Sequence, residues 1–298
     1  MRKSKTVLGD ICKITMGQSP DSSTYHTTNI GLPFYQGNAD FGELYPKTRI
    51  WCSRPQKIAE PENILLSVRA PIGALNIAKE KCCIGRGLAA IAPHKNFCFN
   101  KYLFYILKYK HNELNARGTG STFKAINKSI LNDLPIDIYP IDRQKRIAAI
   151  LDKATELIAL RKQQIQKLDL LVKSRFIEMF GNTQTNPKDL SLMPWCDVFL
   201  TTTGKLDSNA MVKNGQYPFF TCAKECFRID TYAFNCEALL LAGNNAAGIY
   251  DVKYYKGKFN AYQRTYVLRL INKQWSYKLF KIQLEDKLLY LQNQSKGS

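Results

Sequence analysis

The chain has 298 residues, 45% of them hydrophobic and 11% aromatic, which is typical of a folded globular protein and not of a disordered one. Lys and Arg outnumber Asp and Glu by 43 to 24, giving a formal net charge of +19. Repulsion among so many positive charges destabilises the folded chain, so the net charge favours a polyanionic partner, most often nucleic acid. The alternative is a generally basic surface that is simply solvated. The sequence has no apolar run long enough for a membrane span or a signal peptide, so we expect a cytoplasmic protein that does not enter the membrane.

Short strands that end in loops are predicted in the first half of the chain. Residues 31–36 indicate a turn entering an aromatic strand, and residues 63–68 an apolar strand that runs into a glycine-containing loop at 69–74. Residues 84–91 form a third such segment. An aromatic amphipathic stretch at 100–110 then predicts a helix.

Between residues 142 and 180 the hydrophobic period changes from two to 3.6. This segment contains no Pro and no Gly, and Gly181 follows it, while Asp142 is a natural N-cap at its start. The pattern predicts one helix of about 39 residues, about 58 Å long. Its apolar stripe needs a partner helix, and we expect pairing through six residues of that stripe. They are Leu151, Ile158, Ile165, Leu168, Val172 and Met179.

The second half repeats the first in the same order. Residues 215–221 match the aromatic strand, residues 237–242 the apolar strand with its loop at 243–248, and residues 261–268 the third segment. A helical stretch at 277–289 follows. Three segments in register predict two domains of similar fold with different surface residues. The fold class expected is therefore α+β, with two similar β-rich domains joined by one long coiled-coil-forming helix.

Nine cysteines are present, an odd number, and Cys222-x-x-x-Cys226 is the segment closest to a metal signature. Zinc sites show tighter paired spacings, and none of the three histidines lies near these cysteines. We therefore expect small apolar thiols in a reducing compartment, and no metal site.

The segment 134–147, Leu-Pro-Ile-Asp-Ile-Tyr-Pro-Ile-Asp-Arg-Gln-Lys-Arg-Ile, resembles the junction between target-recognition domain and spacer helix in type I restriction–modification specificity subunits. Residues 8–20 resemble the opening of the first domain of that family, and residues 178–182 resemble its helix exit. The resemblance implies a first recognition domain at 1–141, a spacer helix at 142–181 and a second recognition domain at 182–298. It also implies a second spacer helix that this sequence lacks, so a shortened subunit is expected.

The resemblance implies sequence-specific binding of a bipartite double-stranded DNA target, with no catalytic residues. Methyltransferase (modification) subunits and a restriction/translocase subunit would be the partners, and S-adenosylmethionine and ATP would bind to those partners only. We expect DNA contacts from loop residues that can reach bases or phosphates. In the first domain these are Gln18, Ser19, Tyr35, Gln36, Asn38, Arg69, Arg86, Arg117, Thr119, Ser121, Thr122 and Lys124. In the second domain they are Lys205, Thr221, Lys224, Asn244, Asn245, Gln263 and Arg264.

Alternative functions remain open at this point. A shortened subunit could act as a homodimer through its spacer helix, with symmetric half-sites, or be a silent cassette. An orphan DNA methyltransferase or nuclease recognition protein is a further alternative. Against an enzyme, the sequence has neither a P-loop nor an Asn/Asp-Pro-Pro-aromatic motif. An RNA-binding protein would be expected to show a GxxG clamp or aromatic RNP strands, and neither is found.

Overall fold

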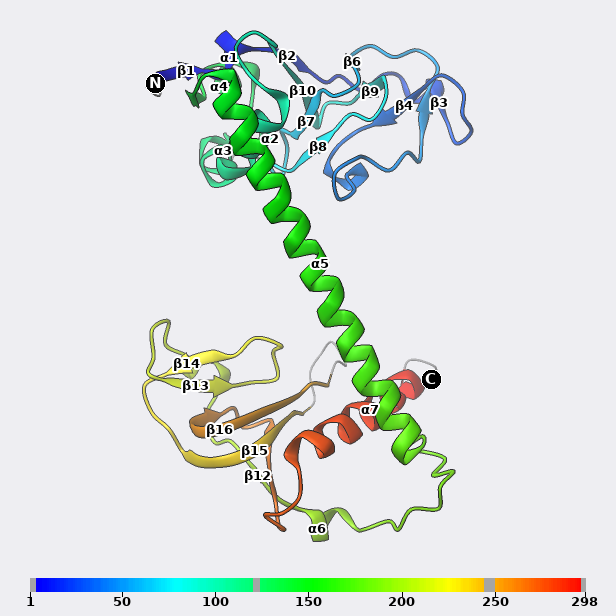
Figure 1. Ribbon diagram of the computed structural model, residues 1–298, viewed down its shortest axis with the longest axis vertical. Helices are drawn as coiled ribbons and strands as arrows, with labels where there is room; N and C mark the ends of the chain where they lie inside the picture. The colour runs from blue at the N-terminus through cyan, green and yellow to red at the C-terminus, as the bar shows by residue number, and fades with distance from the viewer. Residues whose placement is uncertain (1–3, 120–123, 244–249, 296–298) are drawn as a thin grey trace. The chain divides into compact units, whose positions relative to one another are not determined.

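The computed structural model describes residues 4–119, 124–243 and 250–295, in two compact units, Met1–Arg161 and Lys162–Ser298. The long helix α5 (Ile141–Phe180) contributes residues to both units. Each unit is described by itself (Figure 1).

The first unit combines three small sheets with short helices. Its strands are β1 (Ser4–Val7), β2 (Cys12–Met16), β3 (Tyr25–His26), β4 (Leu32–Tyr35), β5 (Trp51–Cys52), β6 (Ile58–Ala59), β7 (Ile64–Ser67), β8 (Leu75–Ile77), β9 (Cys82–Ile84), β10 (Leu88–Pro93) and β11 (Pro135–Ile138). Its helices are α1 (Leu8–Ile11), α2 (Asn100–Tyr109), α3 (His111–Arg117) and α4 (Lys128–Asn132), with 3-10 turns η1 (Ser22–Thr24) and η2 (Asn38–Asp40).

The strands of the first unit pair in the orders β2-β10-β7-β8, β3-β5-β4-β9-β6 and β1-β11. All of these pairings are antiparallel except that of β4 with β9. Strand β7 is buried along its whole length, in keeping with its apolar residues Ile64, Leu65 and Leu66. Tyr102, Leu103 and Leu107 of α2 are also buried, in the same core as Ile64 and Leu66 of β7.

The second unit contains one larger sheet. Its strands are β12 (Phe199–Thr203), β13 (Tyr217–Phe220), β14 (Phe227–Ile229), β15 (Phe234–Ala242), β16 (Val252–Ala261) and β17 (Thr265–Leu270), in the order β12-β17-β15-β16-β13-β14. Helices α6 (Trp195–Val198) and α7 (Tyr277–Ser295) and the 3-10 turn η3 (Ser208–Ala210) complete it. Phe280, Leu284 and Leu288 recur every four residues on α7 and pack on the core around Leu239 and Val252.

The structure confirms the predicted α+β fold class and its long helix. Helices α2, α5 and α7 lie where the sequence predicts helices, and β4, β7, β13 and β15 lie where it predicts strands. Two details were wrong. Helix α5 begins at Ile141, so Asp142 lies in its first turn and is not the cap.

The third predicted segment is not one strand in either half. Residues 85–87 form a turn between β9 and β10, and residues 262–264 a turn between β16 and β17. The cause in the first half is a close backbone approach. A Cβ on Gly87 would lie 2.4 Å from the carbonyl oxygen of Gln36, so the chain turns where glycine allows it. Arg86, Gln263 and Arg264 therefore lie on turns, where their side chains reach the surface.

Two further findings concern the described residues. None of their helices is both long and apolar enough to cross a membrane. Within the same ranges, His, Cys, Asp and Glu side chains form no group of three that could hold a metal ion.

Candidate nucleic-acid interface

Four of the predicted DNA-contacting residues of the first unit line one cavity. Gln36 follows β4, Arg69 follows β7 and Arg86 follows β9, and together with Asn38 they surround a cavity of about 480 Å³. Gln36, Arg69 and Arg86 are exposed. The ends of three strands thus bring together two guanidinium groups and two side-chain amides, the groups suited to base edges and phosphates.

Backbone hydrogen bonds fix the turn that carries Arg86. Gly85 N donates to Tyr35 O at 2.8 Å, Gly87 N donates to Gln36 O at 3.1 Å, and Val68 N donates to Gly87 O at 2.9 Å. The turn is therefore tied both to β4 and to the chain just after β7. Since these bonds use main-chain atoms only, the side chain of Arg86 is left to the surface.

Gln18 and Ser19 lie beside the same turn. Gln18 N donates to Ile84 O at 3.0 Å, and the Ser19 hydroxyl accepts from Arg86 N at 3.2 Å. Tyr35 is different, because only 4% of it is exposed and its hydroxyl bonds to Thr48 Oγ1 at 2.7 Å. Burial raises the pKa of Tyr35. This side chain belongs to the core, and a DNA contact from Tyr35 stays a prediction.

The segment around residue 119 is joined to the Arg69 loop. Thr119 and Ala125 exchange backbone hydrogen bonds of 3.0 and 2.9 Å, and Ala125 also forms a bridge with Arg69. Arg117 is half-exposed and pairs with Glu113 at 2.7 Å, while Lys124 is exposed. The predicted residues Ser121 and Thr122 lie outside the described residues.

A second cavity, of about 490 Å³, lies at the corresponding place in the second unit. Arg264 and Thr221 line it together with Asn209, Met211 and Tyr262. Lys205, Lys224 and Gln263 are exposed, and Gln263 N donates to Leu206 O at 2.9 Å. The predicted residues Asn244 and Asn245 fall outside the part of the chain that the structure describes.

Thr221 is only 5% exposed, and its hydroxyl accepts from Ala223 N at 3.1 Å. The hydroxyl therefore holds a turn inside the unit, and a DNA contact from Thr221 stays a prediction.

The two units share one backbone framework around these cavities. Its hydrogen bonds in the first unit are Gly85 N to Tyr35 O, Gly17 N to Leu88 O and Val68 N to Gly87 O. Their counterparts in the second unit are Tyr262 N to Phe220 O, Gly204 N to Thr265 O and Gly243 N to Arg264 O. Among the described strands, one pair in each unit is parallel, β4 with β9 and β13 with β16. On this common framework Gln36 corresponds to Thr221 and Arg86 to Gln263.

Sequence reasoning missed two residues of the first cavity, Asp40 and Arg49, which form an ion pair of 2.5 Å. They are nine positions apart in a segment with no clear periodicity, so no sequence pattern links them. In the second cavity it missed Asn209 and Met211, which precede the strand that the repeat indicates.

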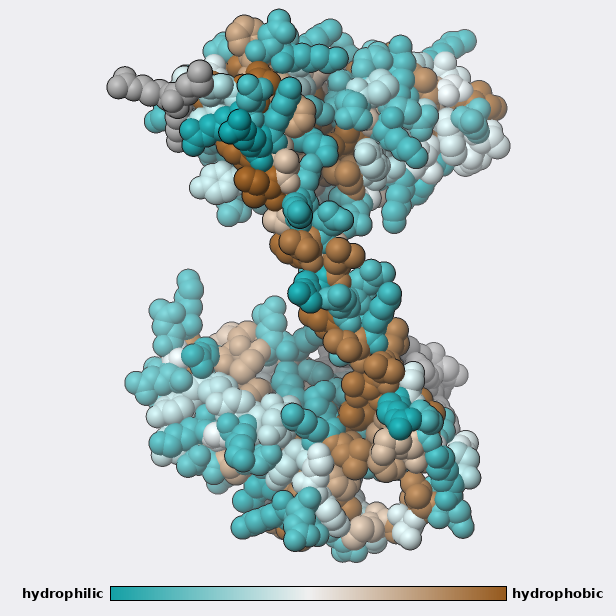
Figure 2. Space-filling view, viewed as in Figure 1, coloured by the Kyte–Doolittle hydropathy of each residue, from teal (hydrophilic) through white to brown (hydrophobic). Residues whose placement is uncertain are grey.

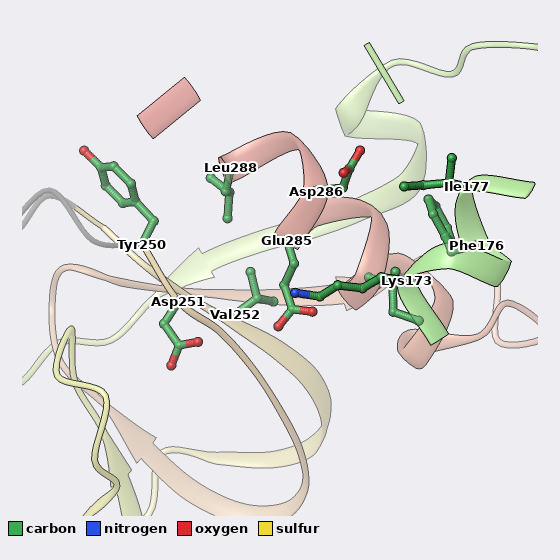
Figure 3. A pocket seen from close by; sticks show the side chains of 10 residues that line it. Lys173, Phe176, Ile177, Tyr250, Asp251, Val252, Glu285, Asp286 and Leu288 are labelled. Atoms are coloured by element: carbon green, nitrogen blue, oxygen red, sulfur yellow. The ribbon is translucent and has the colours of Figure 1, made fainter. Parts of the chain in front are cut away.

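Helix α5 carries the predicted pairing residues on its surface. Leu151, Ile158, Ile165, Leu168, Val172 and Met179 are all exposed, Ile158 and Ile165 at 58% each. Figure 2 shows brown, hydrophobic side chains along this helix. Phe176 differs, because it is buried. It lies at the edge of a hollow of about 370 Å³ between the end of α5 and α7, which Ile177, Val252 and Leu288 also line (Figure 3).

Comparison with known families identifies the class of protein. The family model described as "Type I restriction modification DNA specificity domain" matches residues 3–170. The chain is 42% identical over 157 residues to the putative type I restriction enzyme MjaX specificity subunit of Methanocaldococcus jannaschii, covering 53% of this chain and 37% of that one. It is 49% identical over 85 residues to the EcoDI specificity subunit of Escherichia coli, covering 28% and 18%. The chain therefore spans less than half the length of these two relatives.

Solved structures give the same result. The HsdS subunit from Thermoanaerobacter tengcongensis matches with a TM-score of 0.50 and 46% identity, over 54% of this chain and 39% of that one. The S subunit from M. genitalium matches over 99% of this chain and 79% of its own, with a TM-score of 0.60 and 15% identity, which supports the fold alone. With a family model over more than half of its length, this chain belongs to the type I restriction–modification DNA specificity family.

Proposed function

We propose that this chain is the sequence-reading subunit of a type I restriction–modification system and recognises a duplex target in two parts. The first domain (1–141) would read one half-site and the second domain (182–298) the other. The observation that carries this proposal is the common backbone framework, which holds different side chains in the two units. Two readers of this design bind two different half-sites.

The charge of the chain supports duplex DNA as the ligand. A net charge of +19 attracts phosphates, and affinity that depends on phosphate contacts falls steeply with salt. The cavities add the second requirement, because specificity needs donors and acceptors at base edges as well as charge. We place this binding in the cytoplasm, where bacterial and archaeal DNA is found.

Chemistry on the DNA would come from partners. The modification subunits would bind S-adenosylmethionine and the restriction/translocase subunit would use ATP, while this chain directs both to the target. Both relatives named above are known as specificity subunits, which supports this division of roles.

Helix α5 would pair with another helix along its exposed stripe. The stripe residues Ile158, Ile165 and Leu168 are each more than half exposed, a costly state for side chains of this size. A second copy of the chain, with its helix antiparallel, would cover them and produce a homodimer.

The test is selection from a pool of random duplex DNA, with and without modification subunits, followed by sequencing of the retained molecules. A split motif with a fixed gap is the expected result. Retention that depends on salt but enriches no motif, even with the modification subunits present, would contradict the proposal.

A further inference from the structure

The pair formed by Asp40 and Arg49 differs chemically from the other arginines of the first cavity. Arg69 and Arg86 are exposed, and no carboxylate of the described residues pairs with either of them. Arg49 also lines the cavity, and its Nη2 atom lies 2.5 Å from Asp40 Oδ1. The cavity therefore contains two unpaired cations and one compensated one.

Asp40 is the centre of a small hydrogen-bond network. Its second carboxylate oxygen accepts from Gln36 N at 2.8 Å and from Gly37 N at 3.3 Å. Its carbonyl oxygen accepts from Lys47 N at 2.8 Å, and its side chain is only 13% exposed. Asp40 thus ties the loop after β4 to the segment that carries Arg49.

Arg49 is held but not covered. Its Nη2 atom also donates to Ala39 O at 3.3 Å, and its side chain is 62% exposed. Within the described residues its Nε and Nη1 atoms form no hydrogen bond, so these donors remain for a ligand. A guanidinium already fixed by a carboxylate loses little conformational freedom on binding.

Phosphate and base contacts place different demands on an arginine. Attraction to phosphate depends on net charge, which Asp40 largely cancels at Arg49 and nothing described cancels at Arg69 or Arg86. Reading a guanine depends on directed donors, since its O6 and N7 atoms are both acceptors in the major groove. The guanidinium of Arg49, which Asp40 orients and neutralises, is therefore better suited to a base. Those of Arg69 and Arg86 are better suited to the phosphates of the DNA.

We propose that Arg49, oriented by Asp40, reads a guanine in the half-site bound by the first domain. Asp40 is then a positioning residue, and Arg69 and Arg86 hold phosphates beside it. This inference rests on the proposed function, because it presupposes that the first domain recognises a half-site.

The experiment repeats the selection from random duplex DNA with four variants of the full chain: Arg49→Lys, Asp40→Asn, Arg86→Ala and, as a matched control, Arg54→Ala. Arg54 is an exposed arginine of the same unit that does not line the cavity. Arg49→Lys keeps the charge and loses the planar guanidinium that Asp40 orients, so preference for guanine at one position of one half-motif should fall roughly threefold or more. The other half-motif should not change.

Asp40→Asn should weaken the same position, and thermal unfolding of this variant shows whether the fold is retained. Arg86→Ala should lower affinity for all sequences alike and leave the motif intact, and Arg54→Ala should change neither. A wild-type motif without guanine in the affected half, or a motif unchanged by Arg49→Lys, would overturn the inference. A wild-type chain that enriches no motif would instead contradict the proposed function.

Discussion

The side chain of Gln144 donates from Nε2 to the carbonyl oxygen of Tyr139 at 2.6 Å, across the junction between β11 and α5. The same Nε2 donates to Phe97 O at 2.9 Å, and Oε1 accepts from Phe99 N at 2.8 Å. The residue is completely buried. One amide therefore satisfies three backbone groups and fastens the start of the long helix to the first unit.

Replacing Gln144 by Ala should destabilise the protein. The change leaves three backbone groups without their partner and a cavity where Gln144 was buried, so we expect the free energy of unfolding in urea to fall by about 1–3 kcal/mol. Gln163→Ala, at an exposed position of the same helix, is the control and should change it by less than about 0.5 kcal/mol. If both variants changed the free energy of unfolding equally, the hydrogen bonds of the buried Gln144 amide would not stabilise the junction.

The double variant Ile158→Lys/Ile165→Lys should abolish pairing of α5. Both residues are 58% exposed in the single chain, and lysines there would place charges in a helix–helix seam. Sedimentation velocity should show a monomer for this variant at concentrations where the wild type is a dimer. Glu156→Lys/Gln163→Lys has the same spacing on another face of the helix and should still associate. A wild type that is monomeric at all concentrations would contradict homodimer formation.

Arg264→Ala should alter only the half-motif read by the second domain. The backbone contact of Arg264 with Gly243 stays in the variant, while the guanidinium at the cavity is lost. We expect a loss of about 1–3 kcal/mol at the position that it reads. The measurement is selection from random duplex DNA, with Arg269→Ala, an exposed arginine of β17 outside the cavity, as the control. Changes in both half-motifs would speak against two independent readers.

Glu113 should make stability depend on pH. Its hydrogen bond from Lys110 and its ion pair with Arg117 hold the pKa of this carboxyl below its usual value. A depressed pKa adds stability above about pH 4.5, and this is lost as pH falls through the folded value. Urea midpoints should therefore show the wild type more stable than Glu113→Gln near pH 7 by less than about 1 kcal/mol, since solvent screens the pair. A difference that persists near pH 3 would exclude the carboxylate charge as its cause.

The parts of this fold that depend on local pattern were predictable. Helix α5 is a segment without Pro or Gly, and its apolar period of 3.6 residues is a local property that does not depend on its tertiary contacts. Its bounds therefore follow closely from the sequence. The repeated strands were found because both copies keep the same alternation of apolar segment and loop.

The parts that depend on tertiary contact were not predictable. In the sequence, Tyr35 looks like an exposed aromatic residue at the end of a strand. Its burial follows only from its tertiary contacts with Thr48 and with the core around Leu65. Asp40 and Arg49 meet because a loop folds back on itself. A contact of this kind leaves no periodic pattern in the sequence, so it could not be predicted. The DNA-contacting roles of Gln36, Asn38, Arg69, Arg86 and Arg264 stay predictions.

The hydrogen bonds that hold the turns at both cavities join main-chain atoms, as between Gly85 and Tyr35 and between Tyr262 and Phe220. The geometry of a reading surface is therefore set mainly by main-chain atoms. Substitutions at exposed positions such as Gln263 cost the fold little, because the hydrogen bonds of the framework do not involve their side chains. A protein built in this way can acquire a new target sequence through point changes while its scaffold stays as stable as before.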